Sequence, residues 1–281
     1  MIDTVLRAAA VQMVSSPDLQ ENLDTANRLI DRAAGEGATL VALPEYFVQI
    51  SGDPTAKLAI AEEFGRGPIQ DMLADAAARH GIWIAGGSMP LTTDDPARVS
   101  NTLLAYGPDG GCVARYDKCN LFSIRTPEVT HDEGLTMVGG DALAVVDHPW
   151  GRVGLAICYD VRFPGFFERL GPVDLILLPA AFTMPTGAAH WELLLRARAV
   201  DNQAYLLAPA QGGTHASGRQ TWGHTMAVDP WGRILAEIDR GEGVITVDLD
   251  RAEIDRVRAS LPVVRDRHMN HALKGVGAEA R

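Results

Sequence analysis

The sequence has few cysteines, no long uncharged segment and no excess of positive charge. Its three cysteines are an odd number without a CxxC pair, which argues against a disulfide framework and favours a reducing, cytoplasmic environment. The longest segment without a formal charge, residues 175–191, contains two prolines and is too short to cross a membrane. The N-terminus has neither a basic region nor an apolar run, so no signal peptide is expected. The formal net charge of −11 argues against a nucleic-acid partner or a membrane surface, because both need concentrated positive charge.

Lysine is also rare in this chain. Only three of the 25 basic residues are lysines, namely Lys57, Lys118 and Lys274. Because arginine is the usual cation here, a lysine is a candidate for a role that a planar guanidinium cannot fill. Lys118 follows a strand-like segment and is the candidate for such a role, whereas Lys57 and Lys274 are expected to be solvated surface charges.

Short apolar or β-branched runs alternate with amphipathic segments along the chain. Hydrophobic residues make up 47% and charged residues 22%, as in globular proteins and unlike disordered chains. Strands are predicted at residues 8–13, 39–43, 82–86, 102–106, 112–116, 142–147, 153–158, 174–178, 204–209, 225–228, 234–237 and 244–247, and helices at 19–34, 69–80, 188–202 and from 251. Strands separated by helices predict an α/β protein whose sheet is largely buried.

Two segments of the first half have counterparts in the second. LPEYF at 43–47 resembles LPAAF at 178–182, and the strand and turn at 102–110 resemble those at 225–232. Either turn residues recur by chance, or two similar halves each build one sheet and the sheets pack face to face. No linker-like tract separates the halves, so a single domain is expected.

Cys158 is the candidate nucleophile. It ends the apolar segment 153–158 and is followed at once by the polar and aromatic turn YDVRFP. The end of a strand can expose a sulfur while neighbouring backbone N–H groups point into the site. The alternative is a buried structural cysteine.

Glu45 and Lys118 are the candidate partners of this thiol. Glu45 follows the apolar segment 40–44, and Lys118 follows the strand-like segment 112–116. A carboxylate can accept the thiol proton, and an ammonium nearby favours the thiolate. A surface acid and a solvated cation are the alternative interpretations.

Together the three residues, in this order and in these surroundings, resemble the Glu-Lys-Cys triad of the nitrilase superfamily of carbon–nitrogen hydrolases. The resemblance extends from residues 8–13 to residues 261–263. It implies a four-layer αββα sandwich with two pseudo-related halves, formed by a hydrolase domain over residues 1–260. It also implies a homodimer or higher homo-oligomer, with the tail 261–281 at a subunit interface or partly mobile.

Within the superfamily the chain resembles the deaminated glutathione amidase branch, with omega-amidases as neighbours. The motifs concerned lie at residues 158–164, 190–199, 211–213, 223–226 and 229–232. This resemblance implies hydrolysis of the C–N bond of a small, anionic carboxamide through a cysteine thioester, with release of ammonia. An N-carbamoyl amidase or a true nitrilase would share the triad, and a non-catalytic scaffold member is the alternative from a different class.

The same resemblance implies further site residues. The family has a second glutamate seven positions before a Gly-acid pair, which favours Glu133 over Glu128. The Lys118 ammonium and the backbone N–H of Tyr159 would hold the oxyanion, and Arg162 would be structural or contact a substrate carboxylate. No cofactor is expected, because the histidines lack metal-ligand spacing and no phosphate-binding loop occurs.

Overall fold

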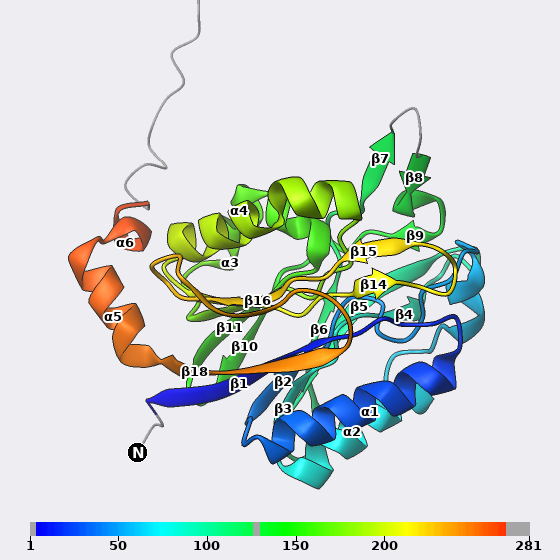
Figure 1. Ribbon diagram of the computed structural model, residues 1–281, viewed down its shortest axis with the longest axis horizontal. Helices are drawn as coiled ribbons and strands as arrows, with labels where there is room; N and C mark the ends of the chain where they lie inside the picture. The colour runs from blue at the N-terminus through cyan, green and yellow to red at the C-terminus, as the bar shows by residue number, and fades with distance from the viewer. Residues whose placement is uncertain (1–3, 126–129, 268–281) are drawn as a thin grey trace, which may run out of the picture.

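Two mixed β-sheets face each other in the computed structural model, which describes residues 4–125 and 130–267 (Figure 1). The first sheet has the central order β18-β1-β2-β3-β5-β4, and β6 and β9 also pair with β5. Its strands are β1 Val5–Gln12, β2 Leu40–Ala42, β3 Trp83–Ala85, β4 Met89–Thr92, β5 Val99–Tyr106, β6 Cys112–Asp117, β9 Met137–Val138 and β18 Gly243–Asp250.

The second sheet has the order β10-β11-β12-β13-β16-β17, and two short hairpins, β7-β8 and β14-β15, stand apart from both sheets. The strands concerned are β10 Ala144–His148, β11 Gly151–Leu155, β12 Leu175–Leu177, β13 Tyr205–Ala208, β16 Thr225–Val228 and β17 Ile234–Ile238, with β7 Ser123–Arg125, β8 Thr130–Asp132, β14 Gly212–Thr214 and β15 Gln220–Trp222 in the hairpins.

Helices cover the outer face of each sheet. Figure 1 shows α1 and α2 over the first sheet and α3 and α4 over the second. The helices are α1 Leu19–Gly35, α2 Pro68–His80, α3 Pro164–Leu170, α4 Met184–Asn202, α5 Arg251–Ser260 and α6 Val263–Arg267, and the 3₁₀ turns are η1 Ala56–Ile60, η2 Glu133–Leu135 and η3 Cys158–Arg162. No helix in the described part of the chain is long and apolar enough to cross a bilayer.

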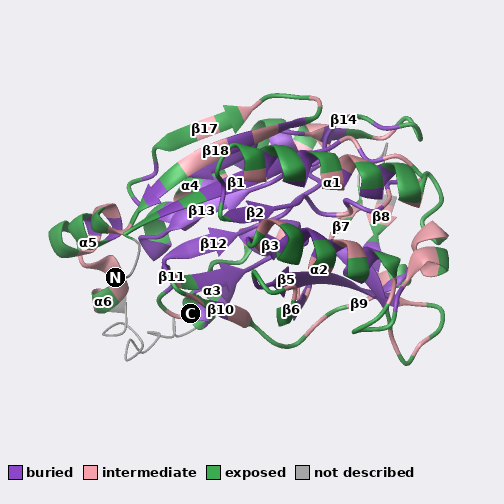
Figure 2. Ribbon diagram, turned by 90° about the horizontal axis from the view of Figure 1, so that it is seen from below, coloured by how far each residue is buried: buried purple, intermediate pink, exposed green. Residues whose placement is uncertain are grey.

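The alternation of side chains along β1 explains the layers. Ala8 and Ala10 belong to the core between the two sheets, whereas Ala9 and Val11 belong to the core beneath α1 and α2. Both faces of the strand are therefore buried, and Figure 2 shows buried strands inside helices whose outer faces are exposed. The four layers run helix, sheet, sheet, helix, which confirms the predicted αββα sandwich.

The two sheets share a strand order, which agrees with the second of the two explanations of the sequence repeat. In each, three parallel strands are followed by an antiparallel one: β1-β2-β3-β5 in the first sheet and β11-β12-β13-β16 in the second. The repeated segments 43–47 and 178–182 directly follow β2 and β12, and β5 and β16 occupy equivalent positions. The recurrence therefore belongs to two related halves and is not a chance repetition of turn residues.

One predicted strand ends early, and this difference positions the candidate nucleophile. The strand predicted to run to residue 158 stops at Leu155, and Cys158 begins η3 with a φ of 46°. The turn forms because the Asp160 carboxylate accepts the Ile157 N–H at 2.8 Å, while the Cys158 N–H donates to the Pro179 carbonyl at 2.9 Å. The predicted tail 261–281 is described only as far as residue 267, where α6 ends.

Candidate active site

Lys118 lies between two carboxylates. Its Nζ is 2.9 Å from Glu45 Oε1 and 2.9 Å from Glu133 Oε2. Glu45 stands in the loop after β2, Lys118 directly follows β6, and Glu133 begins η2. All three side chains are at most 4% exposed. The fold thus brings together three charged residues that are distant in the sequence and removes them from bulk water.

The charges of this cluster stabilise one another. Burial by itself lowers the pKa of Lys118, but the carboxylates of Glu133 and Glu45 raise this pKa well above its usual value. Burial raises the pKa of Glu133, but the Lys118 ammonium and hydrogen bonds from Tyr46 and Phe122 outweigh it and lower this pKa. Lys118 therefore stays an ammonium, and Glu133 a carboxylate, at neutral pH.

Glu133 is held by neutral donors as well as by Lys118. The Tyr46 hydroxyl donates to Oε1 at 2.6 Å, and the Phe122 N–H donates to Oε2 at 2.7 Å. With these bonds Glu133 occupies the place expected for the second glutamate. The other candidate, Glu128, lies outside the described residues.

Cys158 completes the group, and we call Glu45, Lys118, Glu133 and Cys158 the tetrad. The Glu45 carboxylate and the Ala181 N–H lie near the Cys158 side chain, and both affect the pKa of its thiol. Burial raises the pKa of the thiol, and Glu45 raises it further against the opposing effect of Lys118, so that it lies well above the usual value. The ammonium favours the thiolate, as expected, but burial and Glu45 outweigh it. The resting sulfur is therefore a thiol, and its proton has to leave during attack.

Asn101 touches the tetrad and was missed by sequence reasoning. Its Nδ2 donates to Glu45 Oε1 at 3.0 Å, and its backbone carbonyl accepts the Lys118 N–H at 2.9 Å. Its Oδ1 is buried and has no hydrogen-bond partner in the part of the chain that the structure describes. An amide side chain at the start of the apolar run 102–106 was the available signal.

Asp160 was also missed, although it lies in the segment that singled out Cys158. Its buried carboxylate accepts the Tyr116 hydroxyl at 2.6 Å, Asn120 Nδ2 at 2.8 Å and the Ile157 N–H at 2.8 Å. Tyr116 and Asn120 flank Lys118 in the sequence, whereas Ile157 flanks Cys158. Asp160 therefore connects the segment that carries the ammonium to the turn that carries the thiol.

Tyr159 and Arg162 lie on the same turn with different surroundings. The Tyr159 N–H is in the first turn of η3, where backbone N–H groups lack an acceptor within the helix, so its oxyanion role stays a prediction. The Arg162 guanidinium lies 5.2 Å from the Phe182 ring centroid and 3.3 Å from His190 Nδ1. It does not line the cavity described next, and this position gives no support to a contact with substrate.

A cavity of about 800 Å³ lies next to the tetrad, with residues that hydrogen-bond to the tetrad in its wall. Tyr46, Asn101 and Phe122, which contact the carboxylates of the tetrad, form part of its wall. Lys57 lines the same cavity, is partly buried and donates to Thr136 Oγ1 at 3.1 Å. The expectation that Lys57 is a solvated surface charge was wrong, because η1 turns it inward; Lys274 lies outside the described residues.

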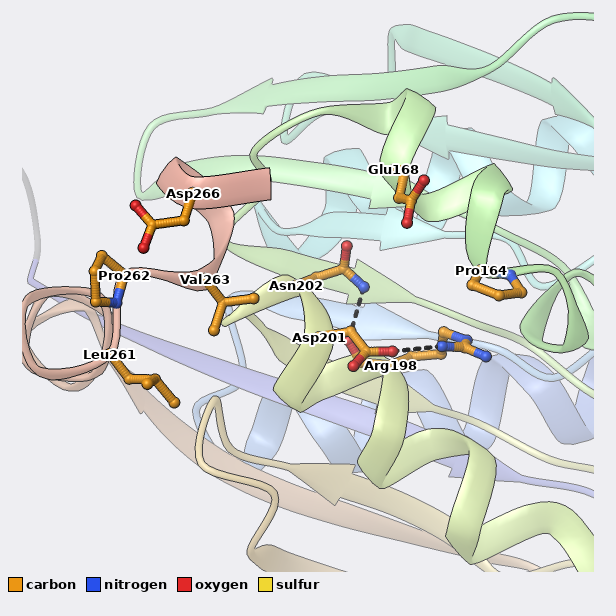
Figure 3. A pocket seen from close by; sticks show the side chains of 9 residues that line it. All are labelled: Pro164, Glu168, Arg198, Asp201, Asn202, Leu261, Pro262, Val263 and Asp266. Atoms are coloured by element: carbon orange, nitrogen blue, oxygen red, sulfur yellow. Dashed lines mark hydrogen bonds and ion pairs between the residues drawn. The ribbon is translucent and has the colours of Figure 1, made fainter. Parts of the chain in front are cut away.

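A second cavity, of about 470 Å³, lies between α3, α4 and the segment that leads into α6 (Figure 3). Unlike the larger cavity, it is lined by none of the described residues that hydrogen-bond to the tetrad. Its wall includes Arg198, which donates to Asp201 at 2.7 Å and to the Val161 carbonyl at 2.9 Å. The Arg198 side chain thus holds the turn η3, and this second cavity is separate from the candidate site.

The known proteins that this chain resembles include amidases, and the resemblance extends over most of its length. The deaminated glutathione amidase of Yersinia enterocolitica is 37% identical over 92% of this chain and 91% of its own length. An omega-amidase of Xenopus tropicalis is 37% identical over 93% of this chain and 94% of its own length. A variant of the amidase from Nesterenkonia sp. AN1, solved with acrylamide added to its active-site cysteine, has a TM-score of 0.75 and 28% identity over 92% of this chain and 98% of that chain.

A family model supports the same relationship over nearly the full length. The model described as carbon-nitrogen hydrolase matches residues 7–259, which include all four residues of the tetrad. The matched region takes in both sheets of the sandwich. The chain belongs to the carbon–nitrogen hydrolase family of the nitrilase superfamily.

Proposed function

We propose that the protein is an amidase that hydrolyses the C–N bond of a small, anionic carboxamide and releases ammonia, with deaminated glutathione as the first substrate to test. One observation carries the proposal: a buried ammonium lies between two carboxylates, one of which lies near the side chain of a buried cysteine. The amidase names of the relatives support the same reaction class.

The first half of the reaction acylates Cys158. Glu45 takes the thiol proton as the sulfur attacks the amide carbon, and the Lys118 ammonium and the Tyr159 N–H stabilise the oxyanion. Glu45 then donates this proton to the departing nitrogen. The C–N bond breaks, ammonia leaves, and the acyl group stays on sulfur as a thioester.

The second half hydrolyses the thioester. Glu45 takes a proton from a water molecule as the water oxygen attacks the thioester carbon, and the same two donors hold the second oxyanion. The C–S bond then breaks, and the thiolate recovers its proton from Glu45. Glu133 acts throughout as a positioning residue, because it holds the Lys118 ammonium without contacting the sulfur.

Asn101 would orient the substrate. A buried polar atom without a partner costs about 1–3 kcal/mol, and Asn101 Oδ1 is an acceptor for which residues 4–125 and 130–267 supply no donor. The NH₂ group of a carboxamide is such a donor, and Asn101 lines the cavity beside Glu45. This contact would direct the nitrogen of the amide toward the carboxylate that must protonate it.

A substrate panel tests the proposal. Ammonia release is measured with deaminated glutathione, alpha-ketoglutaramate and simple aliphatic amides, for the wild-type protein and the Cys158→Ala variant. Undiminished turnover by the variant would refute the mechanism. Similar rates with every amide would refute the choice of substrate only.

The omega-amidase reaction is the second candidate, because that relative is as similar as the first. Preference for alpha-ketoglutaramate in the panel would select it, and preference for an N-carbamoyl compound would select an N-carbamoyl amidase. A non-catalytic scaffold makes a different prediction. Iodoacetamide would then label Cys158 no faster than Cys112 or Cys119.

We further propose a homodimer or higher homo-oligomer in the cytoplasm, without a cofactor. The hydrolase domain would cover residues 1–260, and residues from 261 onward would contribute to a subunit interface. Light scattering coupled to size-exclusion chromatography of the full chain and of a chain ending at residue 260 tests this arrangement. A monomeric full-length protein would refute it.

A further inference from the structure

Three basic side chains of the described residues line the larger cavity. Lys57 comes from η1, Arg219 from the turn between β14 and β15, and His131 from β8. The β7-β8 and β14-β15 hairpins lie at the same end of the molecule (Figure 1). Three segments far apart in the sequence thus bring two cations and an imidazole to one wall, in a protein whose formal net charge is −11.

Neither of these two cations has an ion-pair partner among the described residues, although both lie in the wall of a cavity. Arg233, by contrast, pairs with both Asp229 and Glu253. Within residues 4–125 and 130–267, Lys57 donates only to Thr136 Oγ1, and no ion pair joins either Lys57 or Arg219 to a carboxylate. A partly buried cation without a counter-charge is destabilising, and a bound anion would relieve that cost.

One acid shares this wall. Asp53 lines the cavity, and hydrogen bonds from the N–H and the hydroxyl of Thr55, at 2.8 Å and 2.7 Å, lower its pKa, as does the charge of Lys57. No ion pair joins Asp53 to either cation within the described residues, so the wall has room for a second anion. Burial lowers the pKa of Lys57, and the nearby Arg219 lowers it further against the opposing effect of Glu133. Both cations line the same cavity, and the charge of Arg219 disfavours the charged form of Lys57, an effect that an anion bound between them would reverse.

We propose that Lys57 and Arg219 form a subsite for a carboxylate of the substrate, namely the carboxylate at the end of the substrate away from the scissile amide. The inference rests on the proposed amidase function and extends it to the residues that select the substrate. Arg219 offers a planar fork that suits both oxygens of a carboxylate, and Lys57 offers a point charge with three donors. The substrate class is an amide that carries a free carboxylate on the same small molecule.

Kinetics with a matched pair of amides tests the subsite. Glutaramate carries a carboxylate at one end and valeramide, of the same chain length, does not. We expect Lys57→Met and Arg219→Met each to lower the ratio of kcat/KM for glutaramate to that for valeramide by about tenfold or more, mainly through KM. Arg169→Met is the matched control, because Arg169 donates to the Gly165 carbonyl and does not line the cavity. It should leave the ratio unchanged.

A binding measurement separates failure of the subsite from failure of the proposed function. Glutarate is titrated into wild-type, Lys57→Met and Arg219→Met proteins by calorimetry, which needs no turnover. A Kd raised about tenfold or more in both variants supports the subsite even if neither amide is hydrolysed. An unchanged Kd and an unchanged kcat/KM ratio, in variants that still hydrolyse amides, would overturn the subsite and leave the amidase proposal standing.

Discussion

The Tyr116 hydroxyl donates a 2.6 Å hydrogen bond to the Asp160 carboxylate. Tyr116 stands two positions before Lys118, and Asp160 two positions after Cys158. Both partners are buried, so the bond forms in surroundings of low polarity where its loss is costly. The relative position of the ammonium and the thiol therefore depends on a contact that involves neither of them.

Replacement of Asp160 by Asn is the first test of this contact. We expect Asp160→Asn to lower the free energy of unfolding by about 2–4 kcal/mol, because one oxygen that accepts two donors becomes an NH₂ group. Tyr116→Phe removes one bond and should cost about 1 kcal/mol. Denaturant unfolding measures both, with Asp147→Asn as the control, since the Asp147 side chain is 93% exposed. Equal stability of all three variants would contradict the prediction.

The lowered pKa of Glu133 predicts that the stability of the fold depends on pH. Its pKa in the folded protein is lowered below the ordinary value of 4.5, so the carboxylate contributes stability above pH 4.5 that is lost as the pH falls through the folded value. Glu133→Gln lacks this contribution. The difference in unfolding free energy between wild type and variant should therefore be constant from pH 5 to pH 7 and shrink on acidification below about pH 4.5. A difference that grows on acidification would refute the assignment.

The ammonium of Lys118 should not be replaceable by a guanidinium. Lys118 is fully enclosed, with its Nζ between two carboxylates, and a larger planar group would displace one of them. We expect Lys118→Arg and Lys118→Met each to lower kcat by at least about 100-fold, because an oxyanion donor is lost. Circular dichroism confirms folding of each variant. Retention of more than a tenth of the activity by Lys118→Arg would contradict this role.

Asn101 makes a prediction that depends on the leaving group. If Oδ1 accepts the N–H of the scissile amide, Asn101→Ala should lower kcat/KM for an amide by about 10–100-fold. The corresponding ester has no N–H to donate, so the same substitution should lower kcat/KM for the ester by a smaller factor. Parallel assays of the two compounds check this difference. Equal losses would show that Asn101 acts only by holding Glu45.

Local patterns predicted an α/β fold and three residues of the tetrad, whereas the four layers and Glu133 were implied by the resemblance to the nitrilase superfamily. Strand-like runs followed by single reactive residues identified Glu45, Lys118 and Cys158. Asn101 and Asp160 escaped notice because their importance comes from partners 56 and 44 positions away along the chain. Two features of Cys158, its φ of 46° and its position in a 3₁₀ turn, also result from tertiary hydrogen bonds and not from local propensity.

Lys57 shows the limit of reasoning from composition. The scarcity of lysine correctly drew attention to Lys118, but the same criterion was not applied to Lys57, which was expected to be solvated. Whether a charged side chain faces water or a cavity depends on the direction in which a short segment such as η1 turns. Lys57 and Arg219 are 162 positions apart in the sequence, so no local pattern indicates that they line the same cavity.

Formation of an acyl-enzyme on Cys158 tests the central claim most directly. The protein is mixed with a candidate amide, quenched within one turnover and measured by intact mass, and the modified peptide is then sequenced. We expect a mass increase equal to the acyl group, located on Cys158 and absent from Cys158→Ala. An adduct on Cys112 or Cys119, or ammonia release by Cys158→Ala at the wild-type rate, would contradict catalysis by this cysteine.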